Sequence, residues 1–202
     1  MDNNQVILVD ERNQEAGTAS KDDVHARGLL HRAFSVFLFD SSGRQLIQRR
    51  ASNKYHTGGL WSNACCSHPH PGESVDLAVK RRVREELGLE CDVNYLFDMK
   101  YRSELQGGLI EHEYDQVYAG TFSGPLRPDP SEIAATRLVD FPSVQSELTS
   151  QPGAFTPWFR LLAREVERAM REPVEGRWTQ TVVEPDGTVA TFYFPTVSGT
   201  SV

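Results

Sequence analysis

Thiol, imidazole and carboxylate groups gather in two short segments of this sequence. In the first, residues 61–70, Cys66 stands two positions before His68. Residues two apart in an extended chain point to the same side, so this thiol and this imidazole share one face. In the second, Glu111 and Glu113 flank His112, and a strand there would point both carboxylates in one direction. The simpler alternatives are a loop with a small buried cysteine and an edge strand whose acids face water.

Two upstream histidines, His25 and His31, extend the set of candidate metal ligands. Three imidazoles with two carboxylates would suit a divalent ion such as Mn²⁺, Fe²⁺, Zn²⁺ or Co²⁺. Spacing alone does not unite ligands that lie tens of residues apart, so a solvated acidic face remains the competing interpretation at this point.

Basic residues flank the cysteine segment on both sides. A cluster of cations in a chain of net charge −7 favours a polyanionic ligand such as a diphosphate, because arginine forks and lysine ammonium groups both bind phosphate. The competing interpretation is a solvated, salt-bridged helix face. The sequence has no G-x-x-x-x-G-K-S/T motif, so a P-loop is excluded. The cations are Arg49, Arg50, Lys54, Lys80, Arg81, Arg82 and Arg84.

Composition narrows the class of protein. The chain has 202 residues, of which 39% are hydrophobic and 24% charged, as in ordinary globular domains. Residues 33–39 form the longest apolar run, far below the roughly 20 residues of a membrane helix. The acidic balance argues against nucleic-acid binding, and three cysteines with two adjacent do not indicate a disulfide framework. We expect a cytoplasmic protein that binds neither membrane nor nucleic acid and exists as a monomer or weak dimer.

The elements that must position these groups follow from local patterns. Residues 33–39 and 45–49 predict two strands joined by a turn at 40–43, after a polar stretch from residue 10 to 30 that we expect to be mainly loop. Residues 50–73 predict a long irregular loop. Residues 74–87 predict a helix with Ser74 as its N-cap and Gly88 at its end.

The second half of the chain continues in the same mixed pattern. Strand-like segments near 91–100, 110–122 and 133–140 precede a helix from Pro157 to about Arg171. The sequence Glu-Pro-Asp-Gly at 184–187 predicts a C-terminal hairpin. The order predicts an α+β fold with a mixed sheet between helices. We expect residues 1–172 to form one domain and residues 173–202 to add a hairpin and a tail.

Several of these motifs occur together in the order of a known family. The segments HRAFSVFLF, SNACCSHPH, GES, RRVREELG and EHEYD resemble type I isopentenyl-diphosphate delta-isomerase over about residues 20–170. The resemblance implies a Nudix-type fold and interconversion of isopentenyl and dimethylallyl diphosphate in isoprenoid biosynthesis, with a small diphosphate as substrate.

The resemblance also implies a role for individual residues. Cys66 and Glu113 would transfer protons, with Tyr101 relaying to the carboxyl. Mg²⁺ would be held by Glu86 and the backbone of Cys66, and a second divalent ion, Mn²⁺ in preference to Zn²⁺ or Fe²⁺, by five side chains. Those five are His25, His31, His68, Glu111 and Glu113. Substrate contacts would come from Lys21, Arg50, Lys54, Arg82 and Trp158, although Trp158 also fits ordinary core packing on its helix.

One departure separates the alternatives within this fold. A hydrolytic Nudix box reads G-x5-E-x7-R-E-U-x-E-E-x-G-U, and aligned on Glu85 and Glu86 this chain has Ser67 at its first position and Arg82 at its central glutamate. A cation at that place would attract phosphate and repel a metal ion, which favours an isomerase over a pyrophosphohydrolase of nucleoside diphosphate derivatives. A binding protein on the same scaffold is the third alternative, and the intact Cys66, His68, Glu111 and Glu113 argue against it.

Overall fold

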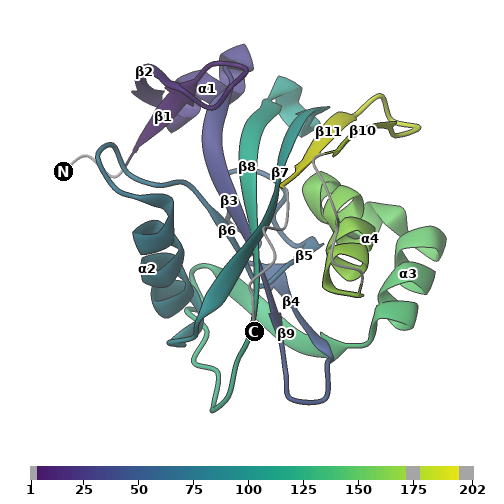
Figure 1. Ribbon diagram of the computed structural model, residues 1–202. Helices are drawn as coiled ribbons and strands as arrows, with labels where there is room; N and C mark the ends of the chain where they lie inside the picture. Colours follow the sequence, from purple (N-terminus) through teal and green to yellow (C-terminus); the bar gives the residue numbers. More distant parts are fainter. Residues whose placement is uncertain (1–3, 172–177, 196–202) are drawn as a thin grey trace.

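The computed structural model describes residues 4–171 and 178–195. In this part of the chain a twisted mixed sheet lies between α2 on one side and α3 and α4 on the other (Figure 1). The strands are β1 (Gln5–Val9), β2 (Glu15–Ser20), β3 (His31–Phe39), β4 (Gln45–Arg50), β5 (Trp61–Ser62), β6 (Cys65–Ser67), β7 (Val93–Glu104), β8 (Ile110–Thr121), β9 (Ile133–Val139), β10 (Trp178–Val183) and β11 (Val189–Phe194). The helices are α1 (Lys21–Arg27), α2 (Val75–Leu87), α3 (Phe141–Ser150) and α4 (Pro157–Arg171), with short 3₁₀ turns at Gln106–Gly108 and Pro152–Ala154. The α+β class with a mixed sheet and a C-terminal hairpin is confirmed.

Strand β3 is the central element of the sheet. It runs parallel to β8 and antiparallel to β1, β6 and β4 in succession along its length. Successive side chains of a strand face opposite sides, and both sides of β3 are buried, which explains its nearly continuous apolar sequence. Phe34 and Val36 pack beneath α2, whereas Phe37 packs with α4. The sheet therefore separates two hydrophobic cores.

Helix α2 forms as the sequence predicts. The Ser74 hydroxyl accepts a hydrogen bond from the Leu77 amide, and Gly88 ends the helix in the left-handed region at φ 65°. Val79, Val83 and Leu87 recur on the buried side and face the sheet. Because both ends are fixed, the helix holds Arg82 and Glu86 at a defined place beside β4 and β6.

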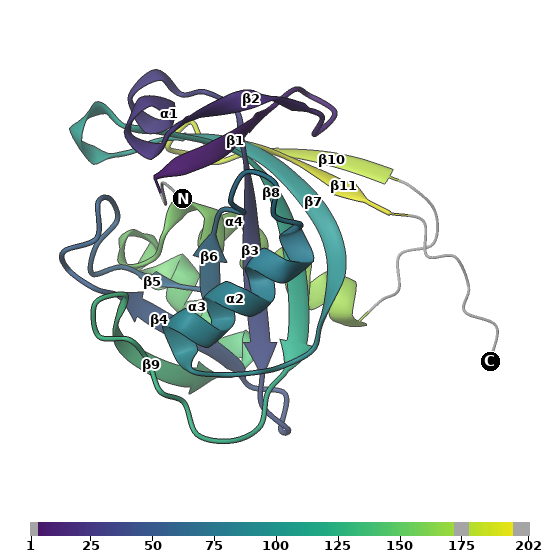
Figure 2. The same cartoon turned by 90° about the vertical axis from the view of Figure 1, so that its left-hand side faces the viewer.

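The N-terminal third differs from the expected loop. Residues 15–20 form β2 against β1, and residues 21–27 form α1 with Ser20 as its N-cap (Figure 2). The α1 N-cap bond runs from the Asp23 amide to the Ser20 hydroxyl, and Gly28 ends the helix in the left-handed region. The prediction that residues 10–30 are mainly loop was wrong, and so was the inference that His25 lies in a loop. Within residues 50–73, expected to be irregular throughout, the structure adds the short strands β5 and β6.

The C-terminal hairpin continues the sheet. Strand β11 pairs with β10 on one side and with β7 on the other, and Phe192 and Phe194 pack into the core that contains α4. The expected division of the chain between residues 172 and 173, and the tail after the hairpin, fall outside the described residues; this boundary stays a prediction. Within residues 4–171 and 178–195, no helix has both the length and the apolar composition needed to cross a membrane.

Candidate active site

Three functional side chains form a row across the sheet. His31 of β3 is the register partner of Glu113 of β8, and Glu113 is the register partner of Tyr101 of β7. The Tyr101 hydroxyl donates to Glu113 Oε2 at 2.9 Å and lies 3.3 Å from Glu111 Oε2. Glu111 and Glu113 are two apart on β8 and therefore face the same side, as expected. Strands β7, β8 and β3 lie side by side in this order in the sheet, so hydrogen-bonded backbone holds all three side chains of the row in place.

Two further histidines reach the same carboxylates from outside the sheet. His25 of α1 lies with Nε2 2.8 Å from Glu111 Oε1, and His68, just after β6, lies with Nε2 3.0 Å from Glu113 Oε1. His31 Nε2 is 3.6 Å from the same Glu113 oxygen. The five side chains that the sequence suggested as ligands are therefore brought together.

The orientation of two imidazoles shows what this cluster can hold. His25 Nδ1 donates to the carbonyl of Lys21 at 2.6 Å, and His31 Nδ1 donates to the carbonyl of Leu29 at 2.9 Å. With Nδ1 carrying the hydrogen, Nε2 of a neutral ring presents a lone pair to a carboxylate oxygen. Two buried acceptors face each other in this way only with a cation between them or a proton on one of them. The donor set fits a divalent ion, and the backbone carbonyls are the outer partners such ligands need.

The two carboxylates have opposite electrostatic environments. Burial and the neighbouring charge of Glu113 raise the pKa of Glu111. Burial opposes ionisation of Glu113 as well, but the neighbouring imidazoles of His31 and His68 outweigh it and hold the pKa of Glu113 well below its usual value. Burial, together with Glu113, raises the pKa of Tyr101 well above its usual value, so its hydroxyl keeps its proton.

The two adjacent cysteines lie on opposite sides of the sheet. The Cys65 side chain is fully buried in the core beneath α2. Cys66 faces the other side, where its Sγ accepts a hydrogen bond from Trp158 Nε1 at 3.1 Å and lies 3.6 Å from the hydroxyl of Ser35. Burial, reinforced by Asp115, raises the pKa of the Cys66 thiol to about 12. Alternation along β6 therefore brings one thiol, Cys66, to the site.

Cationic side chains and one indole ring complete a small cavity of about 60 Å³. Arg50 lies over the Trp158 ring at 5.4 Å, and burial, with help from Lys54, lowers the pKa of Lys21. The predicted substrate contacts line this cavity together with Cys66 and Glu113, whereas Tyr101 is connected to it through its hydrogen bond to Glu113. Its lining includes Lys21, Arg50, Lys54, Arg82, Trp158, Cys66, His68, Glu111 and Glu113.

Glu86 occupies a different position from the other expected metal ligands. One oxygen accepts from Arg82 Nη2 at 2.6 Å and the other from Gln48 Nε2 at 3.4 Å. Gln48 Nε2 also donates to the carbonyl of Ala64, which precedes the two cysteines. The predicted Mg²⁺ site at Glu86 and the Cys66 backbone thus lies at the edge of the cavity and stays a prediction.

Sequence reasoning missed several residues of the site. His56 Nε2 lies 3.0 Å from Glu111 Oε1, and its ring meets that of Trp158 edge to face. Burial, with the charge of Arg50, lowers the pKa of His56 to about 2. Glu132 forms an ion pair with Lys54 and lies 3.4 Å from Arg82. No local pattern marks His56 or Glu132, because both reach the site through the fold of long loops.

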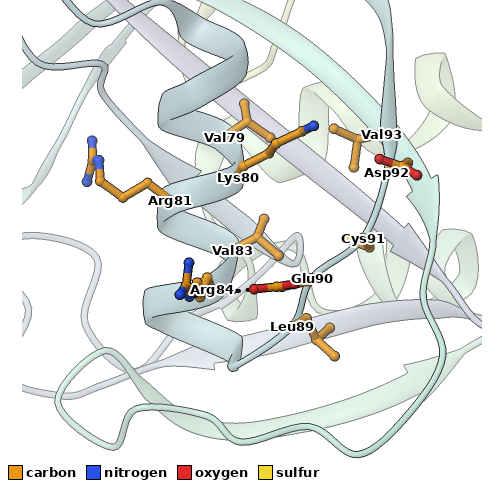
Figure 3. A pocket seen from close by; sticks show the side chains of 10 residues that line it. All are labelled: Val79, Lys80, Arg81, Val83, Arg84, Leu89, Glu90, Cys91, Asp92 and Val93. Atoms are coloured by element: carbon orange, nitrogen blue, oxygen red, sulfur yellow. Dashed lines mark ion pairs between the residues drawn. The ribbon is translucent and has the colours of Figure 1, made fainter.

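Larger cavities lie elsewhere and carry less chemistry. One of about 550 Å³ opens between α2 and residues 89–93 (Figure 3), where Arg84 and Glu90 form an exposed pair at 3.8 Å. The residues that line it include Cys91 but no histidine. Volume therefore does not identify the site; the convergence of buried donors and acceptors does.

Comparison with known proteins decides the family. A model of the NUDIX domain matches residues 29–159. The isopentenyl-diphosphate Delta-isomerase of Burkholderia multivorans is 46% identical over 173 residues, which cover 86% of this chain and 96% of that protein. The enzyme of the same name from Serratia proteamaculans is 43% identical over 82% of this chain and 96% of its own length. The chain belongs to the isopentenyl-diphosphate Delta-isomerase family.

Solved structures support the Nudix fold of this isomerase family member. A protein of Deinococcus radiodurans superposes with a TM-score of 0.66 at 22% identity, over 80% of this chain and 98% of its own. The MutT protein of Methanosarcina mazei gives 0.58 at 18% identity, over 71% and 96%. At these identities the likeness concerns the fold alone.

In the Nudix segment of this family member, Glu73 agrees with the hydrolytic pattern and has a structural role, whereas Arg82 departs from that pattern. Glu73 accepts two hydrogen bonds from Arg81, each at 2.8 Å, and one from the His70 amide at 2.9 Å. This contact fastens the loop that carries His68 to α2. At the central position, Arg82 pairs with Glu85 and Glu86 at 2.8 and 2.6 Å, so a guanidinium occupies the place where the hydrolytic pattern has a carboxylate.

Proposed function

We propose that this protein interconverts isopentenyl diphosphate and dimethylallyl diphosphate, a step of isoprenoid biosynthesis. Membership of the isomerase family supports the activity. The observation that carries the proposal in this chain is the meeting of one thiol, Cys66, with Glu113 at one small cavity, where Glu113 also accepts a hydrogen bond from the buried Tyr101. Moving a double bond by one position requires a proton to be added at one carbon and another to be removed two carbons away. Two separate proton-transfer groups answer that requirement.

Tyr101 and Glu113 are proposed to serve the alkene end. Because the pKa of Glu113 lies well below its usual value, this carboxyl must first take up a proton from solvent; it is then a strong acid, and Tyr101, which keeps its own proton and is hydrogen-bonded to Glu113, can pass that proton on to the alkene. Cys66 is proposed to take the proton from C2 as a thiolate, which becomes a thiol in this step; a thiol pKa of about 12 makes that thiolate a strong base. Protonating an unactivated alkene produces a tertiary carbocation, and the Trp158 ring would stabilise it through its π face by about 2 kcal/mol in a water-free site.

The cationic side chains are proposed to hold the diphosphate. Lys21, Arg50, Lys54 and Arg82 reach one cavity. Glu132 pairs with Lys54 and Arg82, and Glu85 and Glu86 also pair with Arg82, so a diphosphate would compete with these carboxylates for the two cations. Binding the diphosphate places the hydrocarbon end between the two proton-transfer groups, which contributes positioning rather than bond chemistry. The cavity is small beside the ~300–1,000 Å³ of ordinary ligand sites, so we expect the segment of residues 51–60 to move when substrate enters.

Divalent cations complete the proposal. Mn²⁺ is the ion proposed for His25, His31, His68, Glu111 and Glu113, with Zn²⁺ and Fe²⁺ as alternatives, and Mg²⁺ is proposed for Glu86 and the Cys66 backbone. When bound, such an ion neutralises the buried carboxylates and makes attached or neighbouring acids stronger. A cytoplasmic location is proposed because three cysteines, two of them adjacent, are the usage of a reducing compartment.

A Nudix pyrophosphohydrolase is the second candidate, because most of the Nudix box is present. Arg82 argues against it: its guanidinium is held in place by Glu85, Glu86 and Glu132, and it opposes a metal ion at the position where the hydrolytic pattern requires a ligand. The proposal of isomerase activity is therefore preferred.

The two candidates differ in their products. Purified protein with Mg²⁺ and Mn²⁺ is incubated with isopentenyl diphosphate, and in parallel with nucleoside diphosphate derivatives. An isomerase converts the first into an allylic diphosphate, which is recognised by its lability in acid, and releases no phosphate from either. Release of phosphate or of a nucleoside monophosphate without an allylic product would refute the proposal.

A further inference from the structure

Asn63 is a fully buried amide directly beside the Cys66 thiol. It lies between β5 and β6, and its Nδ2 donates to the carbonyls of Val36 at 3.1 Å and Cys65 at 2.9 Å. Carbonyl oxygens only accept, so the nitrogen of this amide must face them. The orientation of the side chain is thereby fixed, and its oxygen, Oδ1, faces Cys66.

The donors around Asn63 Oδ1 follow from this orientation. Cys66 Sγ lies 2.8 Å from Oδ1, and an amide oxygen can only accept, so the thiol donates its hydrogen to it. The Ser62 hydroxyl donates to the same oxygen at 3.0 Å. Because Ser62 has a single hydrogen, its oxygen accepts from Trp158 Nε1 at 2.9 Å and from the Thr156 hydroxyl at 3.1 Å.

These bonds fix the direction of the polar hydrogens of Ser62, Asn63, Thr156 and Cys66. Ser62, Asn63 and Thr156 are fully buried, so water does not compete for the bonds. Ser35, the other hydroxyl near the thiol, donates to Asp115 Oδ2 at 2.8 Å and therefore turns its hydrogen away from Cys66. The thiol hydrogen thus points at Asn63, and the sulfur presents its lone pairs to the Trp158 N–H and the cavity.

We infer that Asn63 is a positioning residue that orients the Cys66 thiol for proton transfer. The inference rests on the proposed isomerase function and adds a residue to it. In the proposed reaction the thiolate form of Cys66 takes the proton from C2, so that the C–H bond breaks and the S–H bond of the thiol forms; in the reverse direction the thiol gives this proton back. Because Asn63 Oδ1 accepts a hydrogen bond only from the protonated sulfur, it sets where that hydrogen lies and which side of the sulfur faces the substrate. Asn63 does this without touching substrate, and Ser62 and Thr156 keep its oxygen and the indole in place.

Infrared spectroscopy of the S–H stretch tests the contact directly. The Cys66 band is assigned as the one lost in Cys66→Ser, which separates it from the bands of Cys65 and Cys91. In the wild type this band should lie at lower wavenumber than that of a small thiol in an apolar solvent. Asn63→Ala should move it to higher wavenumber, because the acceptor is removed. A wild-type band at the position of the free thiol would overturn the inference even if the variant failed to fold.

Steady-state kinetics on the same variants test the role. Loss of one ordinary hydrogen bond predicts a fall in kcat of about tenfold in Asn63→Ala. The KM for isopentenyl diphosphate should change by less than about twofold, since the cations are untouched. Gln45→Ala is the matched control: Gln45 is another fully buried amide, at the far end of β4, and its loss should change neither the Cys66 band nor kcat.

The outcomes separate the inference from the proposed function. A shifted band with unchanged kcat in Asn63→Ala, or an equal fall in kcat in Gln45→Ala, would refute the positioning role. A wild-type protein that shows the lowered band but isomerises nothing would refute the proposed function, and the positioning role with it, while leaving the contact itself established.

Discussion

Replacing Glu73 by glutamine removes the charge that fastens the His68 loop to α2. Glu73 is mostly buried and accepts hydrogen bonds from Arg81 and from the His70 amide. The bonds from Arg81 in particular lower the pKa of Glu73 from 4.5 to about 2. We expect Glu73→Gln to destabilise the fold and, because His68 stands on the same loop, to weaken binding of a divalent ion at His68 and Glu113.

The magnitude follows from the shift in pKa. At 1.36 kcal/mol per unit, ionised Glu73 contributes about 3 kcal/mol to folding. The single glutamine oxygen can keep the bonds from Arg81 Nη2 and the His70 amide, whereas the bond from Arg81 Nε is lost, so a net cost of about 2 kcal/mol is expected. Because the folded pKa lies below the unfolded one, this stability is fully present above pH 4.5 and is lost as the pH falls towards 2.

Urea unfolding in metal-free buffer measures this cost. The difference between wild type and Glu73→Gln should be about 2 kcal/mol at pH 7 and should fall by about half or more at pH 3. Glu85→Gln is the matched control, because Glu85 also pairs with Arg81 and Arg82 but its side chain is 46% exposed; it should cost below about 0.5 kcal/mol. Equal costs for the two variants, or a Glu73 cost independent of pH, would refute this reasoning.

Three predictions concern the site itself. Cys66→Ala should abolish isomerisation and Cys65→Ala should retain most of it, because the two side chains face opposite sides of the sheet; equal loss of kcat with both proteins folded would contradict the assignment. Arg82→Glu should raise the KM for diphosphate substrate by about tenfold or more, since a cation facing phosphate becomes an anion, and should create no efficient hydrolase; an unchanged KM would show that Arg82 serves only its ion pairs. Glu111→Gln should lose bound metal and regain part of its activity in excess Mn²⁺, whereas Glu113→Gln should stay inactive; stoichiometric metal in both purified variants would reject a shared site.

Elements with strong local signals were predictable from the sequence. Helix α2 combines a serine N-cap, an apolar stripe every four residues and a terminal glycine, and the structure places its bounds as expected. The hairpin of β10 and β11 follows from the turn sequence at 184–187. In these cases the information lies within a few residues, so no knowledge of the tertiary fold is needed.

Two short helices had weaker signals. In α1, only Val24 is a buried apolar residue of the seven, so no apolar stripe marks the helix. Its signals were the caps, Ser20 and Gly28, within a highly charged segment. In α3, Asp140 is the N-cap, its side chain accepts a hydrogen bond from the Ser143 amide, and a proline follows in the first turn. This local signal is present in the sequence, but the helix is not among those predicted from it.

The composition of the site was predictable only in part. The resemblance indicated His25 as a metal ligand and Lys21 as a substrate contact, although local patterns predicted a loop where the structure has α1. His56, Asn63 and Glu132 have no motif of their own, and their contacts depend on how residues 51–63 fold back over the sheet. Such contacts connect residues distant in sequence, and a single sequence does not reveal them.

Proton NMR of isopentenyl diphosphate in D₂O tests the central claim most directly. With purified protein, Mg²⁺ and Mn²⁺, the account predicts that the signals of the terminal alkene decrease and those of the dimethylallyl isomer appear, with deuterium entering the new methyl group from solvent. Cys66→Ala under the same conditions should leave the spectrum of the substrate unchanged. A wild-type sample whose spectrum stays that of isopentenyl diphosphate, or in which inorganic phosphate is released without an allylic product, would contradict the account.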